Sequence, residues 1–180
     1  IGWKFSPHRV GRKMGLKNFG YFLYRRIDKI YNVFTGEEDG VFFQLMDVEF
    51  HQGEFIAQED FKMTLLTVKL EKELPNFTLE KEWIFDRLPV FGDFEDIDFE
   101  DYPEFSKEYK LKGTNEPKIR SFFGDELLKF LEQKDTFHVE ANSSGLLIFK
   151  KERLATIQEV RELIDFSVDL VKTIERYSRQ

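Results

Sequence analysis

Residues 156–174 read TIQEVRELIDFSVDLVKTI, and this stretch decides the fold class. Thr156 and Glu159 have the T-x-x-E spacing of a capping box, in which each side chain binds the backbone N–H of the other residue. Apolar residues recur every three or four positions, as in an amphipathic helix: Ile157, Val160, Ile164, Val168, Val171 and Ile174, widened by Leu163, Phe166 and Leu170. The pattern predicts a helix over 156–177. Its apolar face must pack on a sheet, because nothing else is available to bury it.

The sheet is expected upstream, where runs rich in Phe, Tyr, Ile and Val are bounded by glycines and acidic clusters. These runs predict an antiparallel meander with strands at 20–25, 29–36, 41–51 and 63–70, which Leu74-Pro75 closes. A separate short strand is predicted at 76–80. Within 41–51, Phe42, Met46, Val48 and Phe50 share one parity, so we expect them on one face. Residues 2–19 carry several glycines and no sustained period, so they are predicted to form a loop with one short helical turn.

The remaining segments complete an α+β pattern. Pro117 and the apolar stripe after it predict a middle helix over 116–133, since proline is tolerated in a first helical turn. The other expected elements are one or two helical turns at 82–90, a strand at 105–112 and a hairpin of 137–141 with 146–150. We therefore predict one α+β domain over 1–180, an antiparallel meander with a middle helix and a long C-terminal helix on the sheet. Residues 1–19 form its basic N-terminal segment.

Charge is distributed in blocks along a chain whose net charge is −7. Residues 1–35 hold eight basic residues and one acid, whereas residues 36–108 hold 21 acids and six bases. Cations interleaved with aromatic rings suit an anionic membrane surface or another anion. The candidate contact residues are Lys4, Arg9, Arg12, Lys13, Lys17, Arg25 and Arg26. The alternative is that these cations pair with the domain's own acids. Nucleic acid is disfavoured, because the rest of the chain would repel phosphates.

Several functional classes lack their sequence signals. The chain has no cysteine, which excludes disulfides, thiolate metal sites and cysteine nucleophiles. Its three histidines, His8, His51 and His138, are far apart, and no hydrolase, metalloprotease, Walker or dinucleotide-binding motif occurs. No run approaches the roughly 18 apolar residues of a membrane-spanning helix. We expect a soluble domain with no catalytic residue, cofactor or metal. Because the chain begins at Ile1, we also expect an upstream segment.

An acidic run raises the question of a divalent cation. It comprises Asp93, Glu95, Asp96, Asp98, Glu100, Asp101 and Glu104. The run fails the Ca²⁺-loop template, because Asp101 stands at the glycine position counted from Asp96 and Lys107 at the bidentate acid position. A solvated loop is expected instead. Apolar residues within and beside it should anchor it to the domain: Phe91, Phe94, Ile97, Phe99 and Phe105.

A set of motifs lies between residues 20 and 175: Leu74-Pro75-x-Phe77-x-Leu79, Asp86-Arg87-Leu88, Asp96-Ile97-Asp98-Phe99-Glu100, Pro103-Glu104-Phe105-Ser106, Tyr109-x-Leu111-x-Gly113, Phe122-Phe123 and Leu127-Leu128-x-Phe130-Leu131-Glu132. Together these motifs resemble an uncharacterised bacterial family, found as soluble domains and often behind N-terminal membrane-spanning helices. The resemblance implies a membrane-proximal context and brings no catalytic residue.

Three functions remain open at this point. The first is a noncatalytic binding domain of a membrane-associated bacterial protein, in the cytoplasm at the inner face of the membrane, with an anionic membrane or a protein as partner. The second is a small-molecule pocket protein or hydrolase with a Phe-lined cavity. The third is an enzyme in which carboxylates such as Asp86 or Asp98 act as acid and base.

Overall fold

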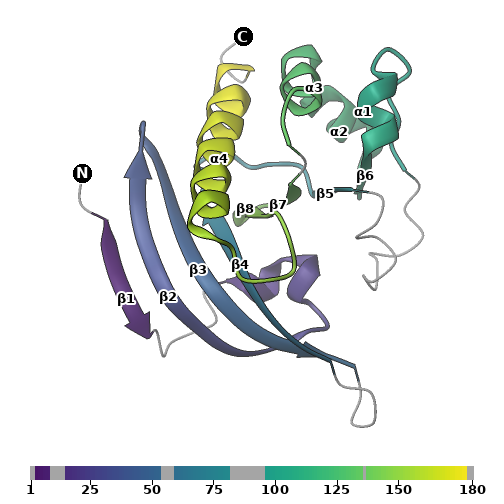
Figure 1. The fold of residues 1–180 in the computed structure, drawn as a ribbon. Helices are drawn as coiled ribbons and strands as arrows, with labels where there is room; N and C mark the ends of the chain where they lie inside the picture. The colour runs from purple at the N-terminus through teal and green to yellow at the C-terminus, as the bar shows by residue number, and fades with distance from the viewer. Residues whose placement is uncertain (1–2, 9–14, 54–58, 82–95, 136, 178–180) are drawn as a thin grey trace.

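A computed structural model describes residues 3–8, 15–53, 59–81, 96–135 and 137–177 (Figure 1). Within these ranges an eight-stranded, fully antiparallel sheet has the order β1-β2-β3-β4-β8-β7-β5-β6. Its strands are β1 (Lys4–His8), β2 (Arg26–Glu38), β3 (Val41–Gln52), β4 (Glu59–Val68), β5 (Phe77–Lys81), β6 (Tyr109–Gly113), β7 (His138–Asn142) and β8 (Gly145–Phe149). The helices are α1 (Pro103–Glu108), α2 (Glu116–Phe122), α3 (Asp125–Glu132) and α4 (Ile157–Tyr177), with 3-10 turns η1 (Leu16–Asn18) and η2 (Gly20–Phe22). The α+β class and the long C-terminal helix on an antiparallel sheet are confirmed.

The two faces of the sheet carry separate hydrophobic cores. α4, drawn in yellow in Figure 1, crosses one face together with α1, α2 and α3, and its Ile164, Val168 and Val171 are buried there. On the other face, Leu16, Phe19, Tyr21 and Phe22 from η1 and η2 pack against the sheet. The domain therefore has helical cover on one face and a short N-terminal segment as cover on the other.

β3 supplies both cores, one from each parity, and Met46, Val48 and Phe50 share one face as expected. Val41, Phe43 and Leu45 face α4, whereas Met46, Val48 and Phe50 face η1 and η2. Each end of this long strand is thus covered on a different face. Phe42 shares the parity of Met46, but it lies where that face has no cover, and it is exposed.

Two predicted N-terminal elements are wrong. Residues 4–8 form the edge strand β1 and not a loop, although η1 provides the expected helical turn. Residues 20–25, predicted as a strand, form η2 and a turn, because Tyr21 and Phe22 face inward as cover for the sheet.

Two predicted central elements are also wrong. Residues 105–112 divide into α1 and β6, and Pro103 occupies the first turn of α1, where its missing N–H costs little. The middle helix is broken into α2 and α3 at Phe123 and Gly124, whose backbones are not helical. The break turns Phe123 into the core, with its ring 4.9 Å from that of Phe77. The segment 82–90 lies outside the described residues.

Within α4 one residue departs from the expected face. Ile157, the first residue of α4, is 77% exposed. Ile164 is buried, and replacing it with Ala should lower the free energy of unfolding by about 2–5 kcal/mol, the usual cost of a large-to-small core change. Chemical denaturation measures this change. Ile157→Ala is the matched control and should leave the midpoint nearly unchanged; equal midpoints for both variants would contradict the assignment.

Candidate functional site

The structure divides the seven basic candidate residues into three groups. Arg9, Arg12 and Lys13 lie outside the described residues. Lys4 on β1 is exposed. Arg26, at the start of β2, has a side chain that is 76% exposed, and its Nε lies 3.8 Å from Asp28 Oδ1. Such an exposed pair contributes little and leaves Arg26 accessible.

Lys17 and Arg25 point into the domain. Lys17 Nζ donates hydrogen bonds to the carbonyl oxygens of Phe22, at 2.9 Å, and Arg25. The Arg25 side chain is 2% exposed, and its Nη1 donates to the Tyr21 carbonyl at 2.6 Å. Its guanidinium also lies 4.0 Å from the centre of the Tyr21 ring. In this structure these two cations stabilise the fold and are not available to a surface partner.

Arg25 also belongs to a buried polar cluster that joins distant parts of the chain. Its Nε donates to Gln52 Oε1 at 3.0 Å, and its Nη2 lies 3.6 Å from Glu152 Oε1. The Tyr21 hydroxyl donates to the same Glu152 oxygen at 2.6 Å. Burial raises the pKa of Tyr21 well above its ordinary value, so the hydroxyl remains protonated and can donate this bond.

We call residues 15–25 the covering segment, because they cover the face of the sheet opposite α4. The Glu140 carboxylate on β7 accepts hydrogen bonds from the backbone N–H groups of Gly20 and Tyr21, the second at 3.0 Å. Asn142 Nδ2 donates to the Asn18 carbonyl at 2.9 Å. Burial raises the pKa of Glu140, even though His138 and these two N–H groups lower it. The sequence signal for this arrangement is an acid between two apolar residues, Val139 and Ala141, of a hairpin strand.

Beneath the covering segment lies a buried acid–imidazole pair. His138 Nδ1 is 2.9 Å from Glu80 Oε1, and both side chains are fully buried. The Phe149 ring stacks on the imidazole at 4.2 Å, and the Tyr21 ring meets it edge-on at 5.5 Å. The contact has the distance of an ion pair without hydrogen-bond geometry, and neither side chain has a hydrogen-bond partner among the described residues. Because the rings and the sheet enclose it, the pair has no open path for a substrate in this part of the chain.

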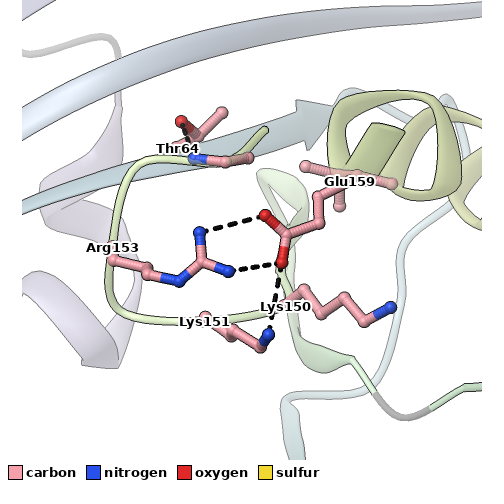
Figure 2. A pocket seen from close by; sticks show the side chains of 7 residues that line it. Thr64, Lys150, Lys151, Arg153 and Glu159 are labelled. Atoms are coloured by element: carbon pink, nitrogen blue, oxygen red, sulfur yellow. Dashed lines mark hydrogen bonds and ion pairs between the residues drawn. The ribbon is translucent and has the colours of Figure 1, made fainter. Parts of the chain in front are cut away.

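A small notch opens beside the first turn of α4 (Figure 2). It is lined by Thr64, Lys150, Lys151, Arg153, Ala155, Glu159 and Leu163. Its volume is about 10 Å³, which is room for about one water molecule. Figure 2 shows that Glu159 pairs with two of the three cations: Arg153 donates two hydrogen bonds to it at 3.0 and 2.6 Å, and Lys151 donates one at 3.2 Å. The third cation, Lys150, donates to Asp135 and Glu162 at 2.8 and 2.6 Å. The notch therefore has neither the size nor the free charge of a metabolite site.

Glu159 should make the stability of the domain depend on pH. Its carboxylate accepts from the Thr156 N–H and from Arg153, and these bonds lower its pKa from 4.5 to about 2. A lowered pKa in the folded state means that the stabilisation is complete above pH 4.5 and is lost as the pH falls toward 2. We expect Glu159→Gln to be less stable than wild type at pH 7, and the difference to disappear as the pH falls below about 2. Denaturation midpoints of both proteins measure this; a constant difference would contradict the assignment.

The described part of the acidic run is anchored, as predicted. Ile97 is buried and its N–H donates to the Leu111 carbonyl at 2.8 Å, while Phe99 packs edge-on against Phe105 at 5.8 Å. The Asp98 carbonyl accepts from Arg120 Nη1 at 2.7 Å. Phe91, Phe94, Asp93, Glu95 and Asp86 lie outside the described residues.

No tight divalent-cation site is expected in this run. Asp96, Asp98, Glu100 and Asp101 are exposed, and among the described residues no group of three or more His, Asp or Glu side chains is placed to hold a metal ion. Calorimetric titration with Ca²⁺ and Mg²⁺ tests the whole run. We expect no binding with a Kd below about 10 μM, within the range of dedicated sensor sites. A tighter Kd would show that the density of carboxylates suffices without the turn-forming glycine and the bidentate acid.

Most exposed large hydrophobic side chains gather in the first quarter of the chain. The described residues with such side chains are Trp3, Phe5, Leu23, Tyr24, Phe42, Leu154 and Ile157. Five of these seven lie between residues 3 and 42, the same part of the sequence that carries the basic residues. Trp3 and Phe5 rest against Phe43 and Phe34, with ring centres 5.5 and 4.6 Å apart, and extend the apolar face to the edge of the sheet.

Among the described helices none is both long and apolar enough to span a membrane.

Comparisons with known proteins bear on the fold. No protein-family model and no curated protein matches the chain. The family resemblance described above therefore stays a prediction. Among solved structures, the crystal structure of the mycobacterial trehalose monomycolate transport factor A, TtfA, is similar, with a TM-score of 0.64 and 11% sequence identity. The alignment covers 97% of this chain and 88% of that chain. At this identity the likeness shows a shared fold alone.

Proposed function

We propose that this chain is a noncatalytic domain of a membrane-associated bacterial protein and that it lies against the anionic inner face of the membrane. One observation carries the proposal: five of the seven exposed large hydrophobic side chains described lie within residues 3–42. Lys4, Arg26 and Lys29 are exposed in the same part of the chain. Apolar side chains beside cations are what an interfacial protein presents to lipid headgroups.

Two further points support this proposal. The similar structure is that of a protein named as a transport factor, and such a name fits a role without catalysis. The buried acids and the histidine of the described core do not line an open site: Glu80 and His138 are fully buried beside each other, and Glu140 binds the covering segment.

Vesicle co-sedimentation tests the proposal. We expect binding to phosphatidylcholine vesicles that contain phosphatidylglycerol, weakened by high salt and absent without the anionic lipid. Each basic residue near an anionic surface contributes about 1 kcal/mol, so Lys4→Gln and Arg26→Gln should each weaken binding about fivefold. Lys118→Gln, at an exposed site on α2, is the matched control and should bind like wild type. Binding that ignores lipid charge, or no binding at low salt, would overturn the proposal.

A protein partner is the second candidate, favoured by the position of Trp3 and Phe5. Strands β1 and β2 extend beyond α4, so this edge of the apolar face has no helix over it (Figure 1). Fluorescence of Trp3 in a Trp83→Phe variant distinguishes the candidates. If acrylamide still quenches Trp3 when the domain is on vesicles, this edge stays free for a protein; if quenching is lost, the edge itself lies against lipid.

A further inference from the structure

We propose that Leu23 and Tyr24 form the part of this domain that enters the headgroup boundary of the membrane, an inference that rests on the proposed function. Leu23 is 50% and Tyr24 71% exposed, although Phe22 before them and Arg25 after them are buried. Two consecutive large side chains therefore project from an otherwise buried segment. We call these two residues the apolar turn.

Two cations, Lys17 and Arg25, hold the base of the apolar turn, although the sequence analysis predicted that they contact the membrane. The buried Arg25 guanidinium donates to the Tyr21 carbonyl, and Lys17 Nζ donates to the carbonyls of Phe22 and Arg25. Gln52 and Glu152 in turn hold Arg25 in place. A turn fixed in this way loses little conformational entropy when it makes a contact, so its exposed side chains are pre-organised.

The carbonyl groups just before the apolar turn have the property that an apolar medium demands. Outside water, each unsatisfied N–H or C=O costs several kcal/mol, so a segment that enters lipid must satisfy these groups internally. The carbonyls of Phe19 and Gly20 accept from the N–H groups of Phe22 and Leu23 at 3.1 and 3.0 Å. The next carbonyls, those of Tyr21 and Phe22, accept from Arg25 and Lys17. The successive carbonyls below the turn are thus satisfied inside the domain.

The side chains of the turn and their neighbours suit the boundary between lipid and water. Tyrosine has an apolar ring and a polar tip and is enriched at that boundary, where basic residues contact lipid phosphates. Arg26 follows the turn directly and is exposed. Two nearby acids oppose the attraction of Arg26 to an anionic surface. Asp28 lies close to the Arg26 side chain. In the strand register, Arg26 on β2 lies opposite His51 on β3, and His51 lies opposite Asp60 on β4. Their repulsion limits the affinity, so removing the Asp60 charge should raise it.

A single-tryptophan reporter tests the position of the turn. Tyr24→Trp is made in a Trp3→Phe, Trp83→Phe background and mixed with phosphatidylcholine–phosphatidylglycerol vesicles whose acyl chains carry bromine. Interfacial segments bury their apolar face about 5–10 Å into the headgroup boundary. We therefore expect blue-shifted emission that the brominated chains quench. Ile157→Trp in the same background, at an exposed site outside residues 3–42, should remain unquenched.

Affinity variants complete the test. Leu23→Ser with Tyr24→Ser changes only exposed side chains and should weaken vesicle binding about tenfold, which corresponds to about 1.4 kcal/mol; Asp60→Asn should strengthen binding. If the wild type pellets with vesicles but the Tyr24→Trp reporter is not quenched, or the double variant binds like wild type, the apolar turn is not the inserted part and the proposed function stands. If no protein pellets, both the inference and the proposed function fail.

Discussion

Replacing Arg25 with Ala should lower the free energy of unfolding by about 3–5 kcal/mol, whereas Arg26→Ala should change it by less than about 0.5 kcal/mol. The two residues are adjacent and chemically identical. Arg25 is buried, contacts the Tyr21 carbonyl, Gln52 and Glu152, and lies over the Tyr21 ring. Its removal leaves the Glu152 carboxylate, which is largely buried, without its positive partner, and an uncompensated buried charge is costly.

Equilibrium denaturation of the three proteins measures this difference, and the location of the damage should be specific. Because Arg25 holds the covering segment, hydrogen exchange should accelerate first at the amides of Gly20, Tyr21 and Phe22. Arg25→Lys should recover only part of the stability, since an ammonium cannot reproduce the planar fork that reaches several partners at once. Equal midpoints for the Arg25 and Arg26 variants would contradict the buried position of Arg25.

The sequence predicts elements whose cause is local. The capping box fixes the start of α4: Glu159 N donates to Thr156 Oγ1 at 3.3 Å and Thr156 N to Glu159 Oε2 at 2.9 Å. The β2–β3 hairpin has an equally local cause in its own turn, where Asp39 and Gly40 both have positive φ, as a two-residue hairpin loop requires. Such signals need no knowledge of the rest of the chain.

Sequence analysis misses the elements that depend on contacts with distant parts of the chain. Nothing within residues 20–25 shows that Tyr21 and Phe22 cover a sheet, because the sheet strands that they contact come later in the chain. The same holds for the candidate site: no local pattern distinguishes Arg25 from Arg26, and the deciding partner, Glu152, is far away in sequence. The strand order β4-β8-β7-β5-β6 is equally nonlocal.

Replacing Gly145 with Ala should destabilise the domain by about 2–5 kcal/mol, from two additive causes. Gly145 has φ +121°, a backbone conformation that side chains disfavour, and a Cβ built there would lie 2.0 Å from the Val68 carbonyl oxygen. The backbone conformation alone costs roughly 1–2 kcal/mol, and forcing an extra carbon into a packed site costs typically about 1–3 kcal/mol more. Gly40→Ala separates the causes, because Gly40 has φ +83° and no atom within 4 Å of such a Cβ. It should lose only the first contribution, about 1–2 kcal/mol.

The position of Gly145 in the sheet makes its loss more consequential than the clash alone. β4 and β8 join the two halves of the sheet, and in the described part of the chain three residue pairs form that junction: Leu66 with Ile148, Thr67 with Leu147, and Val68 with Leu146. The Val68 carbonyl that meets the new Cβ belongs to this junction. Hydrogen exchange in Gly145→Ala should therefore accelerate first at these paired residues, while β2 and β3, which pair over most of their length, keep their protection. If hydrogen exchange accelerates uniformly across the sheet, or if Gly145→Ala loses no more stability than Gly40→Ala, the β4–β8 junction tolerates the alanine side chain.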